Sequence, residues 1–184
     1  ASLLSGFGCS LMERAAIDAY CRSREVPLAS ALRSDMLGID LGRLRPDLAP
    51  CKVSEVLPKR PVRSILVRHT VGLGDPLTDG EIPAEERLHD GLPHSLVENI
   101  RSYGLRLLKI KLSGDSAADH QRMAALAELL ARKDANAIRF TLDGNEQFQS
   151  FAAFRDAWEQ LRSTSSIAEM LDRRLLFVEQ PLHR

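Results

Sequence analysis

The pattern of apolar and polar positions is most regular in three stretches that alternate with the period of two typical of β-strands. In Leu105–Ser113 the opposite faces differ sharply, because one carries only apolar side chains and the other carries Lys109 and Lys111. The apolar face consists of Leu108, Ile110 and Leu112. Two ammonium groups side by side on a strand of a buried sheet need anionic partners, because burial of an unpaired charge is costly. The pattern therefore predicts a strand with one core face and one charged face.

The same alternation recurs in Ala137–Asn145 and Leu175–Leu182, and it supplies the anionic partners. Asp143 and Asn145 fall on the polar face of the first of these strands, and Glu179 falls on that of the second. The apolar faces are built by Ile138, Phe140 and Leu142, and by Leu176 and Val178. The interval between successive strand ends has room for one helix and two loops. This spacing predicts a parallel β/α barrel, a fold whose catalytic groups lie at the C-terminal ends of the strands.

Apolar positions at helical spacing predict the remaining elements. A helix from Ser10 to Arg24, with Ser10 as its N-cap, is expected to end before Pro27. Further helices are expected over residues 29–37, 95–103, 115–133 and 167–173, and from about residue 148. A first barrel strand is expected at Arg63–Val71, followed by a long loop, Gly72–Pro93. Loops of that length are usually functional or mobile.

A proline-containing link that ends near residue 60 predicts the domain boundary. Residues 1–60 are expected to form a helical part and the linker, and residues 61–184 to form the first half of a (β/α) barrel. The fold class predicted is thus α/β, with the first four strands of a TIM-type barrel. Because a complete barrel typically needs about 250 residues, we expect this chain to be part of a longer one.

Charge and composition narrow the function. The 184 residues include 25 basic and 25 acidic ones, so the formal net charge is zero and neither nucleic acid nor a membrane surface is the expected partner. No apolar run reaches the length of a transmembrane helix, and the N-terminal stretch does not have the pattern of a signal peptide. The three cysteines have no metal-ligand spacing, so we expect reduced thiols in a cytoplasmic protein.

Asp143 and Glu179 are the oxygen ligands that Mg²⁺ prefers, and Mn²⁺ accepts the same ligands. The alternative is that both carboxylates only neutralise Lys109 and Lys111. Nearby positive charge favours the neutral form of a lysine, and a neutral lysine can act as a general base. A metal ion beside it can stabilise the oxyanion formed when a proton leaves the carbon next to a carboxylate. The residues therefore predict metal-assisted proton abstraction.

Three motifs carry a resemblance to the enolase superfamily: KIKLSG at 109–114, LDGNE at 142–146 and FVEQPL at 177–182. The stretch FGCSLMERAAIDAYCR at 7–22 is similar to the last helices of the α+β capping domain that precedes the barrel in that superfamily. The Lys-x-Lys form resembles the muconate-lactonizing-enzyme subgroup of the mandelate racemase/muconate lactonizing enzyme family. A Lys or His base with Mg²⁺ is the known chemistry of this superfamily.

The resemblance implies a role for each motif residue. Lys111 would be the base and Lys109 its electrostatic neighbour, while Asp143 and Glu179 would be the first two metal ligands and Asn145 a supporting residue. The third carboxylate ligand and the opposing lysine of the subgroup belong to later strands. One departure is Gly144, where alanine is more usual.

The expected function is that of a magnesium-dependent isomerase, a racemase, epimerase or cycloisomerase, that removes the α-proton of a small carboxylate substrate. An acid-sugar dehydratase is the alternative within the same chemistry, and a non-catalytic barrel that binds a small acid is the alternative of another class. His69 and His183 lie at strand ends and are further candidates for substrate contact. We also expect a homo-oligomer.

Overall fold

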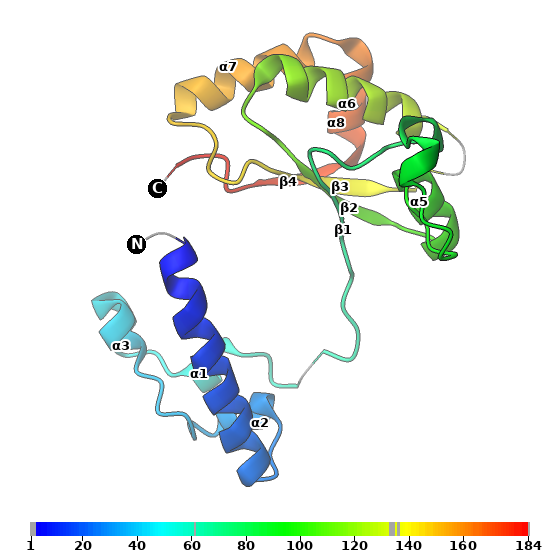
Figure 1. Ribbon diagram of the computed structural model, residues 1–184. Helices are drawn as coiled ribbons and strands as arrows, with labels where there is room; N and C mark the ends of the chain where they lie inside the picture. The colour runs from blue at the N-terminus through cyan, green and yellow to red at the C-terminus, as the bar shows by residue number, and fades with distance from the viewer. Residues whose placement is uncertain (1–2, 61, 133–134, 136, 184) are drawn as a thin grey trace. The chain divides into compact units, whose positions relative to one another are not determined.

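The computed structural model describes residues 3–60, 62–132, 135 and 137–183 (Figure 1). The chain divides into two compact units, residues 1–65 and 66–184. The sequence places the boundary after residue 60, and Pro61, the last proline of the predicted link, lies outside the described residues. No helix among the described residues is long and apolar enough to cross a membrane.

Helices alone build the described part of the N-terminal unit. They are α1 (Leu3–Ser23), α2 (Leu28–Arg33), α3 (Leu41–Leu44), the 3₁₀ helix η1 (Pro46–Leu48) and α4 (Val53–Val56). The predicted N-cap at Ser10 is wrong, because α1 begins at Leu3 and the Ser10 hydroxyl instead donates to the Phe7 carbonyl, at 2.9 Å, inside the helix. Extending a helix that has already formed costs little, so the local capping signal does not stop it.

The C-terminal unit is a four-stranded sheet in the order β1-β2-β3-β4, with every neighbouring pair parallel. The strands are β1 (His69–Val71), β2 (Leu107–Lys111), β3 (Arg139–Asp143) and β4 (Leu175–Glu179). The helices between them are α5 (Leu96–Tyr103), α6 (Ser116–Leu130), α7 (Phe151–Arg162) and α8 (Ser165–Arg174). The predicted parallel pairing of the lysine strand with the Asp143 strand is therefore confirmed, with Lys111 opposite Asp143.

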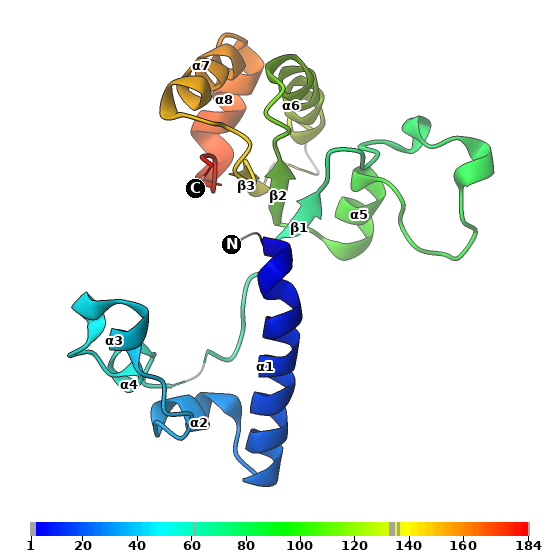
Figure 2. The same ribbon diagram turned by 60° about the vertical axis from the view of Figure 1, so that its left-hand side comes forward.

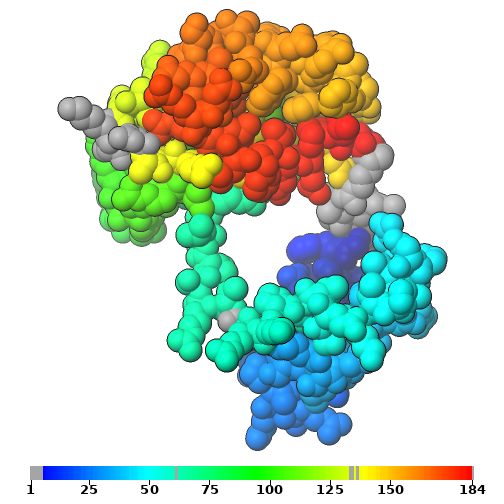
Figure 3. All heavy atoms as spheres, turned by 180° about the vertical axis from the view of Figure 1, so that it is seen from behind, coloured from blue at the N-terminus to red at the C-terminus, as the bar shows by residue number. Residues whose placement is uncertain are grey.

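The core of this unit lies between one face of the sheet and the helices. Figure 1 shows α6, α7 and α8 together on one side of the strands, and the space-filling view shows α7, α8 and the C-terminal segment as one continuous surface (Figure 3). The largest fully buried side chains come from both layers: Leu108, Ile110, Phe140 and Leu142 from the sheet, and Met123, Leu126, Leu130 and Ile167 from the helices. These strand residues are the ones that the period-two pattern assigns to the apolar faces.

The first strand is shorter than predicted. Only His69–Val71 pairs with β2, and Ile65, Leu66 and Val67 are exposed. The register explains the difference, because β2 begins at Leu107 and so offers no strand opposite residues 63–67. Beyond β1, the long loop contains two short 3₁₀ helices, η2 (Asp79–Glu81) and η3 (Ala84–Glu86).

The last strand contains an irregularity that the alternating pattern does not anticipate. Phe140 is level with Leu175, but Leu142 is level with Val178, so two residues of β4 lie opposite Thr141. This is the arrangement of a β-bulge. Leu175 and Val178 pack against the core, whereas Leu176, which alternation assigns to the apolar face with Val178, is 39% exposed.

Three helices of the C-terminal unit begin after a residue whose side chain caps them. Ser95 caps α5, Asp115 caps α6 and Ser150 caps α7, each accepting a hydrogen bond from a backbone amide of the first turn. Helix α7 therefore begins at Phe151, three residues after the predicted start. The predicted end of α6 at Lys133 lies outside the described residues, and the helix as described ends at Leu130.

Candidate functional site

The charged face of the sheet centres on Asp143. The ammonium nitrogens of Lys111 and Lys109 lie 2.7 Å and 3.1 Å from the same carboxylate oxygen, Oδ2. The Asp143 side chain is only 3% exposed, and the lysine side chains are about one-fifth exposed, at 22% and 21%. Neighbouring parallel strands in register bring these residues together, because Lys111 is level with Asp143. Asp143 thus offsets the repulsion between two adjacent positive charges.

Opposing effects act on the pKa of Asp143. Burial alone would raise it, because desolvation disfavours the carboxylate. The hydrogen bonds from Lys111, Lys109 and the backbone amide of Asn145, together with the charge of Lys111, outweigh burial and hold the pKa below its ordinary value. Asp143 is therefore a carboxylate at neutral pH.

Asn145 reaches Asp143 through its backbone. Its amide donates to Oδ1 of Asp143 at 3.0 Å, while its side chain is exposed. Asn145 adopts a φ of +45°, a conformation that asparagine tolerates better than most residues. The structure therefore gives Asn145 a role in fixing the orientation of the Asp143 carboxylate, and both oxygens of that carboxylate are engaged.

Glu179 lies level with Asp143 on the neighbouring strand, and its carboxylate has a different partner. Oε2 of Glu179 is 2.9 Å from Nη1 of Arg68, which also donates to the hydroxyl of Thr141 at 2.7 Å. The Arg68 guanidinium carbon lies 5.6 Å from the centre of the Phe177 ring, within the range of a cation–π contact. The charged face thus has two ion-paired groups: Asp143 with two lysines, and Glu179 with Arg68.

Sequence reasoning missed Arg68 as a site residue. The alternation of side chains along the strand could have indicated it. Arg68 precedes Thr70 by two positions, and Thr70 is level with Lys109 on the charged face. The same alternation that identifies the lysines therefore places Arg68 on the charged face.

Asp119 is a second residue that sequence reasoning missed. It is buried in the first turn of α6, where Oδ1 accepts from the amide and the hydroxyl of Ser113, both at 2.8 Å, and Oδ2 accepts from the amide of Gly114 at 3.1 Å. These three bonds fix the loop that follows Lys111. The sequence feature that indicates this role is an aspartate in the first turn of a helix that follows a strand. The backbone amides at such a helix start have no partner within the helix and are available to a carboxylate.

The structure places His69 on the face of the sheet opposite to that of the lysines. His69 is level with the buried Leu108, so its side chain belongs to the face that packs against the helices. His183 is exposed, and its backbone amide donates to the Phe148 carbonyl at 2.9 Å. The prediction treats a strand end as one location, whereas the pleat sends successive side chains to opposite faces.

The segment after β3 is hydrogen-bonded to the segment after β4, and Gly144 lies where they meet. Its amide donates to the Glu179 carbonyl at 2.9 Å, and a Cβ built on Gly144 would lie 2.7 Å from Cα of Pro181. The contact is with backbone, so a side chain there has to displace the strand end. Glycine, which has no Cβ, fits at this position without such a displacement.

Gly144→Ala is therefore expected to lower the free energy of unfolding by about 1–3 kcal/mol, the usual cost of overpacking. Urea denaturation measures this change. Gly80→Ala is the matched control, because a Cβ at Gly80 meets no atom within 4 Å. Equal unfolding midpoints for the two variants would show that the segment after β4 yields freely and that the close approach at Gly144 has no energetic consequence.

The donor atoms on the charged face match part of a magnesium site. Mg²⁺ is commonly held by one or two carboxylates, with water and substrate in the other positions. Asp143 and Glu179, level on adjacent strands, provide two such carboxylates. Across residues 3–60, 62–132, 135 and 137–183, no group of three or more His, Cys, Asp or Glu side chains is placed to hold a metal. Asp143 and Glu179 thus have the donor chemistry that Mg²⁺ prefers, and they are the two side chains that would bind it here.

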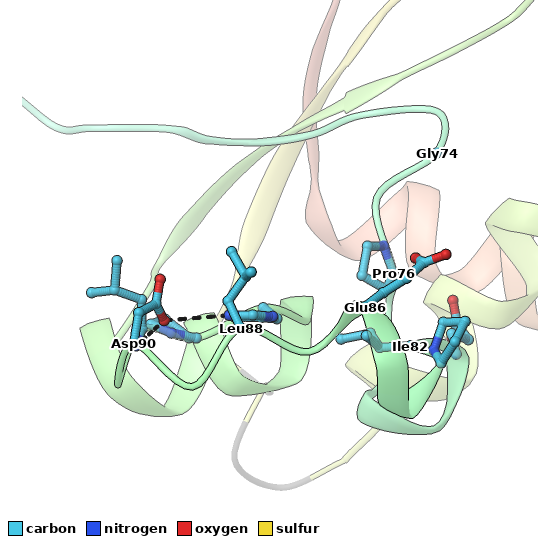
Figure 4. A pocket seen from close by; sticks show the side chains of 11 residues that line it. Gly74, Pro76, Ile82, Glu86, Leu88 and Asp90 are labelled. Atoms are coloured by element: carbon cyan, nitrogen blue, oxygen red, sulfur yellow. Dashed lines mark hydrogen bonds and ion pairs between the residues drawn. The ribbon is translucent and has the colours of Figure 1, made fainter.

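Two cavities of the C-terminal unit have linings that do not include the paired lysines. One, of about 490 Å³, is formed by the loop between β1 and α5, with Glu86, Leu88 and Asp90 around it (Figure 4). In it, Oδ1 of Asp90 lies 3.4 Å from Nε2 of His94. A second cavity, of about 400 Å³, is lined by Ser113, Asp119 and Arg122 among others. Neither cavity is lined by Lys109, Lys111, Asp143 or Glu179, so the charged face is described by its ion pairs.

Comparison of the chain with known proteins gives no family assignment. No family model, no curated protein and no solved structure matches it.

Proposed function

We propose that the chain carries the base and two metal ligands of a magnesium-dependent enzyme that removes the α-proton of a carboxylate substrate, as its three motifs resemble those of the enolase superfamily. The observation that carries the proposal is the convergence of Lys109, Lys111 and Asp143, with Glu179 level with Asp143 on the next strand. A base and two hard oxygen ligands on one face are the groups that this reaction needs.

The topology supports a barrel over an open doubly wound sheet. The strands follow one another in chain order, β1-β2-β3-β4, and the buried residues of all four intervening helices belong to one core. Doubly wound sheets instead reverse their strand order and place helices on both faces. Consecutive parallel strands with helices on one side are the repeat of the (β/α) barrel, and Figure 2 shows β1 and β2 turned relative to one another.

The ion pair between Arg68 and Glu179 also indicates a curved sheet. In a flat sheet, strands about 4.8 Å apart would place β1 and β4 about 14 Å apart. Arg68 lies one residue before β1, so the pairing of β1 with β2 and of β2 with β3 places it level with Arg139. Glu179 is level with Asp143, which lies further along β3. The side chains would then have to cover about 13 Å along the strands as well. Two side chains cannot span that diagonal on a flat surface, so the charged face is concave, as the inner wall of a barrel is.

Each residue of the face has a distinct task in the proposed reaction. Lys111 takes the α-proton at Nζ, and Lys109 supplies the adjacent positive charge. Asp143 and Glu179 would hold Mg²⁺, which supplies positive charge for the oxygen of the anion left after proton removal. As a ligand, Asp143 would no longer serve as the counterion that both ammonium groups share. The backbone amide of Asn145 keeps the Asp143 carboxylate oriented during this exchange of partners.

The charge of the face suits an anionic substrate. Among the ion-paired groups of the face, Arg68, Lys109 and Lys111 provide three positive charges against the two carboxylates of Asp143 and Glu179. Mg²⁺ would increase this excess of positive charge. A small carboxylate would bring the opposite charge to a concave, partly buried surface, where electrostatic attraction is stronger than in bulk water.

The experiment that tests the proposal is solvent exchange of substrate α-hydrogens. The chain is incubated in deuterated buffer with Mg²⁺ and a panel of N-acylamino acids, dipeptides and acid sugars, and proton NMR records the loss of each α-hydrogen signal. Exchange that requires Mg²⁺ and stops with chelator is expected for at least one substrate. Loss of a hydroxyl from an acid sugar would favour the dehydratase. Binding of acids without exchange in any of them would favour the non-catalytic barrel.

A further inference from the structure

Arg68 lies on the charged face but neither takes the proton nor binds the metal ion in the proposed reaction. It immediately precedes β1, at the opposite edge of the sheet from β4, and yet its guanidinium pairs with Glu179. The arginine and glutamate side chains are 32% and 29% exposed, so both are largely removed from solvent. Because this contact spans the two intervening strands, it does not arise from residues that are neighbours in the sequence.

Three features hold the guanidinium in place. Nη1 donates to the hydroxyl of Thr141, which is fully buried on β3, and to Oε2 of Glu179. The planar group also lies over the ring of Phe177, two residues before Glu179 on β4. An arginine fixed by a buried hydroxyl and an aromatic ring presents its donor at one position. Lysine cannot reproduce this arrangement, because it lacks the planar fork.

A fixed hydrogen-bond donor restricts the rotation of the Glu179 side chain. Its side chain has several rotatable bonds, and free rotation has to be lost before the carboxylate can act as a ligand. Hydrogen bonds from outside the ligand set commonly orient ligating carboxylates, and their loss typically weakens metal binding. Arg68 engages one oxygen, Oε2. A carboxylate held by one oxygen can still offer the other.

We propose that Arg68 is a positioning residue that holds the Glu179 carboxylate level with Asp143 in the metal-free protein, and thereby prepares it to bind the cation. The part that concerns the metal ion rests on the proposed function. The part that concerns the position of Glu179 rests only on the contacts of Arg68 with Thr141, Phe177 and Glu179.

The test compares Arg68→Met with Arg139→Met in the complete chain. Arg139 is exposed and lies on the same face of the sheet, on β3, two residues before Thr141. Both variants remove one positive charge from this face, but only the first removes the ion pair with Glu179. Arg68→Lys retains the charge without the fork, and Arg68→Gln is the second neutral variant in case the methionine variant does not fold.

Crystal structures of the metal-free wild type and variants provide the first measurement. Glu179 is expected to occupy one position in the wild type and in Arg139→Met, and several positions in Arg68→Met or Arg68→Gln. An unchanged, single Glu179 position after loss of Arg68 would overturn the proposal, whatever the protein does with metal.

Titration calorimetry with MgCl₂ provides the second measurement. Removal of Arg68 is expected to weaken Mg²⁺ binding about 10–100-fold, and Arg139→Met by less than about twofold, because only Arg68 orients a ligand. Arg68→Lys is expected to lie between them. Equal or tighter Mg²⁺ binding without Arg68 would show that its charge opposes the cation and would overturn the proposal. If the wild type binds no Mg²⁺, the proposed function fails, and the crystal structures still decide whether Arg68 positions Glu179.

Discussion

Lys111→Ala is expected to reduce the Mg²⁺-dependent exchange of substrate α-hydrogens by about 10²–10⁴-fold, the usual contribution of a positioned general base. Alanine keeps the strand and removes the only group proposed to accept the proton. In the proposal the neighbouring Lys109 supplies positive charge and accepts no proton, so little exchange is expected to remain. Proton NMR in deuterated buffer measures the rate.

Lys109→Met is the matched control for this result. It removes the other lysine that contacts Oδ2 of Asp143 and leaves Lys111 in place. Some exchange is therefore expected to remain. If Lys111→Ala exchanges both substrate enantiomers at the wild-type rate, Lys111 is not a base and the lysine pair is structural. Loss of exchange for one enantiomer alone would imply a second base on the opposite side and would favour a racemase or epimerase.

Asp143→Asn is expected to abolish Mg²⁺ binding measured by calorimetry and to lower the free energy of unfolding by about 3 kcal/mol, the lower end of the cost of breaking a buried ion pair. The lower end applies because Lys109 and Lys111 are about one-fifth exposed, at 22% and 21%, and can be partly solvated. The amide has no charge to offset the two ammonium groups. Unchanged Mg²⁺ affinity in this variant would contradict the ligand assignment.

The stability difference between wild type and Asp143→Asn is expected to depend on pH. The pKa of Asp143 is lower in the folded chain than its ordinary value, so the folded state binds the proton less readily than the unfolded state. The stabilisation is therefore complete above the unfolded value of about 3.9 and is lost as the pH falls through the lower, folded value. Urea denaturation at pH 7 and at successive acidic pH values measures it.

Asp172→Asn is the control for this pH dependence. Asp172 also has a lowered pKa, because Arg162 donates to it, but its side chain is 60% exposed. Solvent screens such a surface pair, so little change in stability is expected. An equal loss of stability in the two variants would show that the buried position of Asp143 does not matter.

The strands of the charged face could be predicted because their alternation is strong and because one face packs on helices. Leu108, Ile110 and Leu142 are fully buried, as the pattern requires, and the register brings Lys111 opposite Asp143. The features that sequence did not predict depend on pairing between distant segments. A bulge in β4 exposes Leu176, and the start of β2 limits β1 to His69–Val71. Neither depends on the local residues alone.

The charged site was predicted less completely than the strands, for a related reason. The lysines and Asp143 lie on neighbouring strands, so a count along each strand is sufficient to bring them together. Arg68 and Glu179 are separated by the width of the sheet, and only its curvature allows their contact. His69 illustrates the reverse error, since its position at a strand end was considered and the side of the sheet that it faces was not.

Crystals soaked with Mn²⁺ test the central claim most directly, because Mn²⁺ accepts the oxygen ligands of Mg²⁺ and scatters anomalously. The account predicts one anomalous peak between β3 and β4, in contact with one carboxylate oxygen of Asp143 and one of Glu179, with the ammonium groups of Lys109 and Lys111 withdrawn from Oδ2. A density map without a peak there at saturating Mn²⁺, with both lysines still on Asp143, would contradict it and would leave the charged face as a structural network of ion pairs.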